Sequence, residues 1–239
     1  MKWHAKSSQT MELPSSWRQI QQGKAYCNAI QRHLEKWFPQ ILGYQILKIG
    51  GLSGEIVMDL PLRHQIILMP KTPKNSTALY GSSEERPTTS LLRATPEALP
   101  FVQQSIDACL LINSLNFVAD PHQLVREVDR VITDDGYLFI SLFTPFSPLI
   151  FKRSLNRANA PKLPFRTFTP WRIIDWLELL HFEILEHKNL TVGSHRCFSP
   201  LSLIVAQKRT YSPLLNTGKV RFNPPPSFNP VGAFKQMHD

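Results

Sequence analysis

Hydrophobic and polar positions form their most regular pattern between residues 97 and 141. The apolar run 108–112 has the length and composition of a strand that is buried on both faces. Asp120, followed by Pro121 and by Gln123, has the signature of a capped helix start, and apolar residues then recur at helical spacing up to Ile132. Turn residues 134–136 precede a second apolar strand. This order predicts a βαβ unit and therefore a parallel sheet.

The flanking segments extend the same architecture. Apolar residues from Trp17 to Trp37 predict one amphipathic helix up to Phe38, which Pro39 ends. A second helix is predicted from Pro170, with a stripe of Trp171, Ile174, Leu177 and Leu180. Further strands are predicted over residues 44–49, 65–69, 90–94, 182–186 and 201–206. The fold class is therefore α/β: a Rossmann-like, doubly wound sheet that is mostly parallel, with helices on both faces.

This pattern also predicts the domain organisation. Residues 1–15 are polar and are expected to be a flexible N-terminus, and residues 16–209 form the domain. Residues 210–239 are rich in Pro and Asn and poor in aliphatic residues, which predicts a disordered tail.

Composition narrows the class of protein. The chain has 239 residues, of which 42% are hydrophobic and 19% charged, as in ordinary globular domains. Three cysteines without metal-ligand spacing, and eight histidines without an H-x-x-x-H pair, predict reduced thiols and no metal site. The sequence begins without a signal-peptide core, and no apolar run reaches the ~20 residues that span a bilayer. These features predict a cytoplasmic protein without a membrane segment.

The charge is unusual. The formal net charge is +9, and the cations concentrate in residues 152–172 and 208–221. One interpretation is solubility alone, and the other is an anionic partner such as a nucleic acid. A nucleic-acid partner would bind with a steep dependence on salt.

Five short motifs stand in a specific order along the chain. They are EALPF (97–101), SID (105–107), VADP (118–121), REVDRV (126–131) and GYLFIS (136–141). Together they resemble the second half of the class I S-adenosylmethionine-dependent methyltransferases, in particular a divergent bacterial branch of the type 11 group. The resemblance extends more weakly from about Trp17 to Arg209. It implies S-adenosylmethionine as the cofactor and an antiparallel pair of strands at one edge of the sheet.

The cofactor half of the family pattern is less complete. The family places L-[DE]-h-G-x-G-x-G after its first strand, and residues 47–54 read LKIGGLSG. Gly50 and Gly54 match the outer glycines, whereas Lys48 replaces the acid and Leu52 the middle glycine. A glycine lets a ligand approach the backbone, so Gly51 is expected to take over part of the middle glycine's task.

The resemblance implies further cofactor contacts from Thr95, Pro96, Glu97 and Asn113. The family ends its second strand with an acid that accepts hydrogen bonds from the ribose hydroxyls, but here the strand ends at Met69 and Pro70. Thr95 stands where the family often has an Asp facing the adenine amine, and its hydroxyl can still accept a hydrogen bond.

The connection 143–169 should overhang the ligand crevice, because it leaves the carboxyl end of a parallel strand. It interleaves cations with phenylalanines, which favours an anionic acceptor. The other interpretation is a solvated loop with a few aromatic residues in the core. With the family resemblance, the predicted acceptor-binding residues are Phe143, Thr144, Arg153, Arg157 and His195.

Two functions follow from these residues. The first is a divergent methyltransferase that transfers a methyl group from S-adenosylmethionine to an unidentified acceptor. Because the sulfonium is already activated, this chemistry needs little from side chains, and no catalytic residue is assigned. The second is a non-catalytic protein of the same fold that binds an anionic partner such as RNA. The feature that discriminates between these two functions is the incomplete glycine loop at Lys48 and Leu52.

Overall fold

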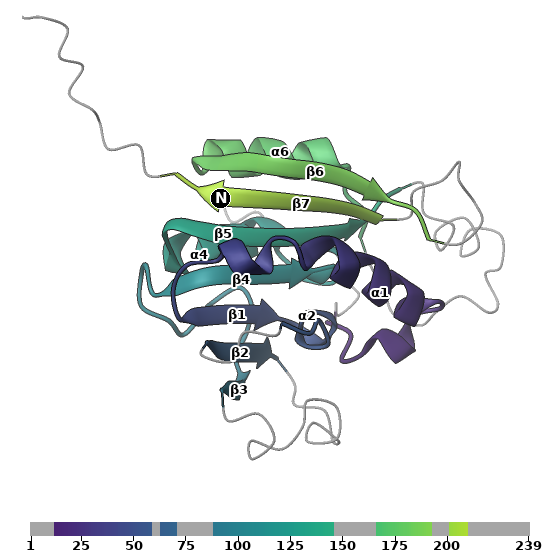
Figure 1. Ribbon diagram of the computed structural model, residues 1–239, viewed down its shortest axis with the longest axis horizontal. Helices are drawn as coiled ribbons and strands as arrows, with labels where there is room; N and C mark the ends of the chain where they lie inside the picture. The colour runs from purple at the N-terminus through teal and green to yellow at the C-terminus, as the bar shows by residue number, and fades with distance from the viewer. Residues whose placement is uncertain (1–11, 59–62, 71–87, 146–165, 193–200, 210–239) are drawn as a thin grey trace, which may run out of the picture.

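A seven-stranded sheet in the order β3-β2-β1-β4-β5-β7-β6 forms the centre of the molecule (Figure 1). The computed structural model describes residues 12–58, 63–70, 88–145, 166–192 and 201–209. Strands β1 to β5 pair in parallel, whereas β7 is antiparallel to both β5 and β6. The mostly parallel sheet with an antiparallel edge pair is therefore confirmed. The strands are β1 (Gln45–Ile49), β2 (His64–Met69), β3 (Thr89–Arg93), β4 (Ile106–Ile112), β5 (Ile132–Phe143), β6 (Phe182–Leu190) and β7 (Leu201–Lys208).

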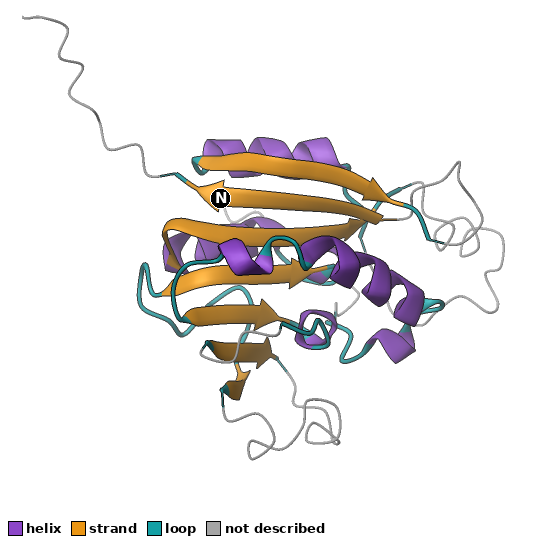
Figure 2. Cartoon of the chain, in the orientation of Figure 1, coloured by secondary structure: helices purple, strands orange, loops and turns teal. Residues whose placement is uncertain are grey.

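Helices cover both faces of the sheet (Figure 2). Helix α1 packs on one face, and α4 and α6 pack on the other. Each face of the sheet has its own cluster of buried apolar residues. This arrangement confirms the doubly wound architecture. The helices are η1 (Trp17–Gln19), α1 (Gly23–Leu34), η2 (Phe38–Gln40), α2 (Gly51–Gly54), η3 (Ser114–Asn116), α4 (Pro121–Val131) and α6 (Pro170–Leu179).

The βαβ unit from β4 through α4 to β5 matches the sequence prediction most closely. The Asp120 side chain accepts a hydrogen bond from the Gln123 amide at 3.0 Å, and Pro121 is the first helical residue. The predicted turn at residues 134–136 is wrong, because β5 already begins at Ile132, directly after the helix. Asp135 has φ 60° there, so the polar residues form an irregularity within the strand rather than a separate turn.

The single helix predicted from Trp17 to Phe38 is wrong. The chain forms the short helix η1, turns at Gln22 with φ 59°, and only then enters α1. A Cβ on Gly23 would lie 2.0 Å from the Trp17 carbonyl oxygen, so the chain folds back tightly at this point. Helical spacing continued across the break because both segments bury residues in the same cluster.

The apolar stripe of α6 also differs from the prediction. Its buried residues are Ile173, Ile174 and Leu177, whereas Trp171 is 69% exposed. Trp171 instead meets the ring of His187 edge-on, at 5.6 Å between centroids.

One carboxylate fastens α1 and the turn after it to the sheet edge. Glu186 on β6 lies 2.9 Å from the Lys36 amine and 3.0 Å from His33 Nε2, and it accepts a hydrogen bond from the Trp37 indole at 2.9 Å. Partial burial alone would raise the pKa of Glu186, but the hydrogen bonds from Lys36, Trp37 and His33 outweigh it and lower the pKa to about 2. Glu186 is therefore a negatively charged anchor at neutral pH.

Candidate functional site

The carboxyl ends of β1 and β4 meet at the point where the strand order changes direction. From β1 the chain proceeds outward to β2 and β3, and it then returns to β4 on the other side. Gly50 follows β1 with φ 87°, a conformation that favours glycine, and its amide donates to the Leu68 carbonyl at 2.8 Å. Asn113 follows β4 with φ 54°. In open α/β sheets, ligands bind at such a switch point.

Two serine hydroxyls connect the carboxyl ends of β1 and β4 through hydrogen bonds. Ser53 Oγ donates to the Ile49 carbonyl at 2.7 Å and accepts from the Ile112 amide at 2.9 Å. Ser114 Oγ donates to the same Ile49 carbonyl at 2.6 Å. All these groups are buried, so the ends of β1 and β4 and the turn after β1 are held in one geometry.

Lys48 occupies the position at which the related pattern has an acid. Its side chain is 3% exposed, and its amine donates to the Ile56 carbonyl at 2.7 Å. Gln65 on β2 similarly donates to the Met58 carbonyl at 3.1 Å. These two side chains fasten the segment after α2 to the sheet, which gives Lys48 a structural task.

The segment after β3 lies at the same edge of the sheet, because β3 is parallel to β2. Thr95 is exposed, Pro96 buried and Glu97 half-buried, and the Ala98 amide closes a turn on the Thr95 carbonyl at 3.2 Å. The structure thus brings this segment to the edge that also carries Gly50 and Asn113.

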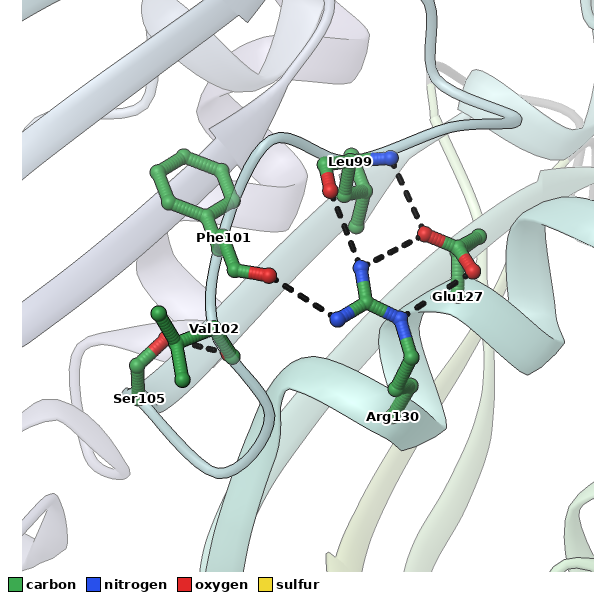
Figure 3. Close-up of polar contacts among 6 residues, drawn as sticks. All are labelled: Leu99, Phe101, Val102, Ser105, Glu127 and Arg130. Carbon is green, nitrogen blue, oxygen red and sulfur yellow. Dashed lines mark hydrogen bonds and ion pairs between the residues drawn. The ribbon is translucent and has the colours of Figure 1, made fainter.

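Helix α4 holds the continuation of this segment in place (Figure 3). Arg130 donates to the carbonyls of Leu99 and Phe101, both at 2.9 Å, and binds Glu127 through two hydrogen bonds of 2.8 and 3.2 Å. Glu127 in turn accepts from the Leu99 amide at 3.0 Å. The hydrogen bond from Arg130 lowers the pKa of Glu127 despite partial burial. The EALPF motif and the REVDRV motif therefore bind each other in the folded protein.

Asn116 joins both ends of the connection between β5 and α6. Its Oδ1 accepts from the Phe143 amide at 3.0 Å, and its Nδ2 donates to the Arg166 carbonyl at 2.6 Å. The Arg166 amide also donates to the Asn116 carbonyl at 2.7 Å. Asn113 belongs to the same buried network, because its Oδ1 accepts from Ser141 Oγ at 2.7 Å. The connection therefore starts and ends beside the switch point.

The predicted acceptor-binding residues divide into two groups. Phe143 is 1% exposed and packs edge-on against Tyr26 and Phe117, and Thr144 is also buried, at the end of β5. Arg153, Arg157 and His195 lie outside the described residues, as does the tail from residue 210. Phe143 thus contributes to the core below the edge.

Several residues of this edge were not assigned by the sequence. Ser114 and Asn116 act through partners that are remote in the chain. Leu13 and Ser15, from the segment expected to be flexible, lie against the glycine loop. The family pattern accepts any residue at position 51, so the glycine found there is the sequence feature that could have indicated this contact.

Among the residues that the structure describes, no three His, Cys, Asp or Glu side chains are grouped to hold a metal, and no helix could span a membrane.

Comparison with known proteins identifies the family. The profile of a family described as "Methyltransferase domain" matches residues 47–140. The chain is 36% identical to the uncharacterized protein YafS of Escherichia coli, over 97% of this chain and 96% of that protein. It is also 23% identical to the uncharacterized methyltransferase YcgJ of Bacillus subtilis, over 62% of each chain.

Solved structures share the fold. The structure of YcgJ matches with a TM-score of 0.55 at 18% identity, covering 77% of this chain and 99% of YcgJ. An S-adenosylmethionine-dependent methyltransferase from Mesorhizobium loti matches with a TM-score of 0.57 at 15% identity, covering 75% of this chain and 97% of that one. At these identities the similarity establishes the architecture alone.

Proposed function

The chain belongs to the class I S-adenosylmethionine-dependent methyltransferases, and from this premise we propose that it binds S-adenosylmethionine and transfers the methyl group to an anionic acceptor. The observation that carries the proposal is the β1/β4 switch point. There Gly50, at φ 87°, presents backbone without a side chain beside the end of β4. A ligand can approach such backbone closely.

The residues at this edge fit the cofactor through backbone and neutral groups more than through charge. Gly50, Gly51 and Gly54 would face the amino-acid part of the cofactor, and Thr95, Pro96 and Glu97 would face the adenosine. The side chain of Asn113 is engaged with Ser141 and Asn116, so its contribution would be to shape the end of β4. Since β2 ends at Met69 without an acid, Glu97 is the carboxylate that we assign to the nucleoside side.

The chain's own task in the reaction is orientation and exclusion of water. The bound cofactor supplies a methyl group that its sulfonium has already activated. The protein then has to hold the acceptor nucleophile in line with that methyl group in a dry site. We assign the acceptor side to the connection 143–169, which Asn116 holds at both ends. Arg153 and Arg157 of this connection, together with His195 from outside it, would supply contacts to an anionic acceptor.

Calorimetric titration with S-adenosylmethionine and S-adenosylhomocysteine tests the cofactor assignment. We expect both to bind the wild-type protein, and Glu97→Gln to weaken binding by about tenfold, the factor that about 1.4 kcal/mol represents. Glu178→Gln, on the exposed side of α6, is the matched control and should leave affinity unchanged.

Absence of binding by the wild-type protein would refute the proposal and favour a non-catalytic protein that binds an anionic partner. That alternative predicts RNA binding that weakens steeply with salt. Where the cofactor binds, transfer of a labelled methyl group into RNA, protein or small-molecule fractions then identifies the acceptor class.

A further inference from the structure

The N-terminal segment 13–17 lies directly across the glycine loop. A Cβ built on Gly51 would lie 2.1 Å from the Ser15 carbonyl oxygen and 2.6 Å from Ser15 Cα. A Cβ on Gly50 would lie 3.3 Å from Leu13 Cδ2 and 3.6 Å from Ser114 Oγ. The two glycines of the loop therefore make room for a part of the same chain.

One end of this segment is firmly anchored. Trp17 is 2% exposed, its indole donates to the Leu52 carbonyl at 3.1 Å, and its amide donates to Glu55 Oε1 at 3.3 Å. The fold-back at Gly23 packs against the Trp17 carbonyl. Trp17 thus fixes where the segment begins its path over the loop.

At the other end Leu13 packs on the core, and its neighbours Pro14 and Ser16 are buried. Leu13 is partly buried and contacts both core clusters, one on each face of the sheet. A residue that touches both clusters sits at the sheet edge, and its neighbours Gly50 and Ser114 place it at the β1/β4 switch point. Leu13 therefore occupies space beside the backbone that a ligand of this fold would approach.

The identity of residue 51 agrees with this arrangement. The glycine-rich pattern of the family leaves that position open, so the pattern does not require a glycine there. Here any side chain would collide with the Ser15 backbone. The physical need for glycine at position 51 comes from the N-terminal segment.

We propose that residues 13–16 form a displaceable plug in the cofactor crevice, with Leu13 as its tip and Trp17 as its fixed end. Ligand binding and docking of the plug are mutually exclusive, so part of the ligand's binding free energy is used to displace Leu13. This inference rests on the proposed function, because it concerns access to the same crevice.

The first test compares S-adenosylhomocysteine affinity in two matched variants. Leu13→Ala removes the tip and should tighten binding by about tenfold, because a partly buried leucine contributes on the order of 1.4 kcal/mol through its apolar contacts. Leu180→Ala also removes a partly buried leucine from one of these clusters, but at the C-cap of α6. It should leave the affinity unchanged. Unchanged or weaker binding in Leu13→Ala overturns the plug.

The second test follows hydrogen exchange of the wild-type protein. The Ser15 amide donates to Gln19 Oε1 at 3.2 Å, so it should be protected while the plug is docked. Saturating S-adenosylhomocysteine should accelerate exchange in residues 12–16. Slower exchange would mean that the segment closes over the ligand as a roof, and it overturns the inference while leaving the proposed function intact. Absence of ligand binding in the wild type overturns the proposed function, and the plug with it.

Discussion

Removal of Arg130 should weaken the attachment of the segment that follows β3 to helix α4, which then keeps only the hydrogen bond from the Leu99 amide to Glu127 among the polar contacts described above. The Arg130 side chain is 36% exposed, and its guanidinium donates to two backbone carbonyls, Leu99 and Phe101, in addition to Glu127. Arg130→Ala leaves both carbonyls and the Glu127 carboxylate without this charged donor. The substitution also removes the hydrogen bond that chiefly lowers the Glu127 pKa, so that pKa should rise.

The magnitude follows from these contacts. Each hydrogen bond to a charged group contributes about 1.5–3 kcal/mol when it is well shielded. Water can replace part of the interaction here, because the side chain is more than one-third exposed. We therefore expect Arg130→Ala to lower the free energy of unfolding by about 2–3 kcal/mol. For a domain of this size that corresponds to a fall in Tm of about 4–12 °C.

Thermal unfolding followed by circular dichroism measures this effect. Arg126→Ala is the control, since Arg126 lies one turn earlier on the same helix and is exposed. A double-mutant cycle with Glu127→Gln should give a coupling free energy of about 1 kcal/mol. The reasoning is refuted if Arg130→Ala unfolds at the same temperature as Arg126→Ala.

Three further predictions concern other parts of the fold. Ser53→Ala should lower the free energy of unfolding by about 1–3 kcal/mol, measured by urea titration, because it leaves the buried Ile112 amide without its partner, whereas the Ile49 carbonyl keeps the Ser114 hydroxyl. Glu186 has a pKa lowered to about 2, so its stabilisation is complete above pH ~4.5 and is lost as the pH falls towards 2. Glu186→Gln should therefore remove about 1–2 kcal/mol of stability at pH 7 but much less at pH 2.5, and equal losses at both would contradict this. Burial raises the pKa of Cys27 to about 11 and also raises that of Cys109. Cys109 is fully buried and should therefore react with a thiol reagent only on unfolding, whereas the half-buried Cys27 should react slowly in the native protein, and rapid labelling of the native Cys109→Ser variant at Cys27 would contradict this.

The sequence by itself determined the features that depend on neighbours along the chain. The cap at Asp120 and the apolar face of α4 are local, since each requires residues within one or two turns. Buried parallel strands such as β4 need continuous apolar runs, which can be read directly. The order of strand, helix and strand then leaves few ways to build the sheet. The architecture could therefore be predicted.

Tertiary structure alone decided how the edge of the sheet is assembled. Asn116 reaches Arg166, Arg130 reaches Leu99, and Ser15 reaches Gly51, all across long sequence separations. No periodicity encodes such contacts, because each depends on where two distant backbone segments are brought together by the packing of the sheet. The same physics explains the failed prediction of one helix through Gln22. Helical spacing records which residues become buried, whereas the turn at Gln22 is set by the close packing of Gly23 on Trp17.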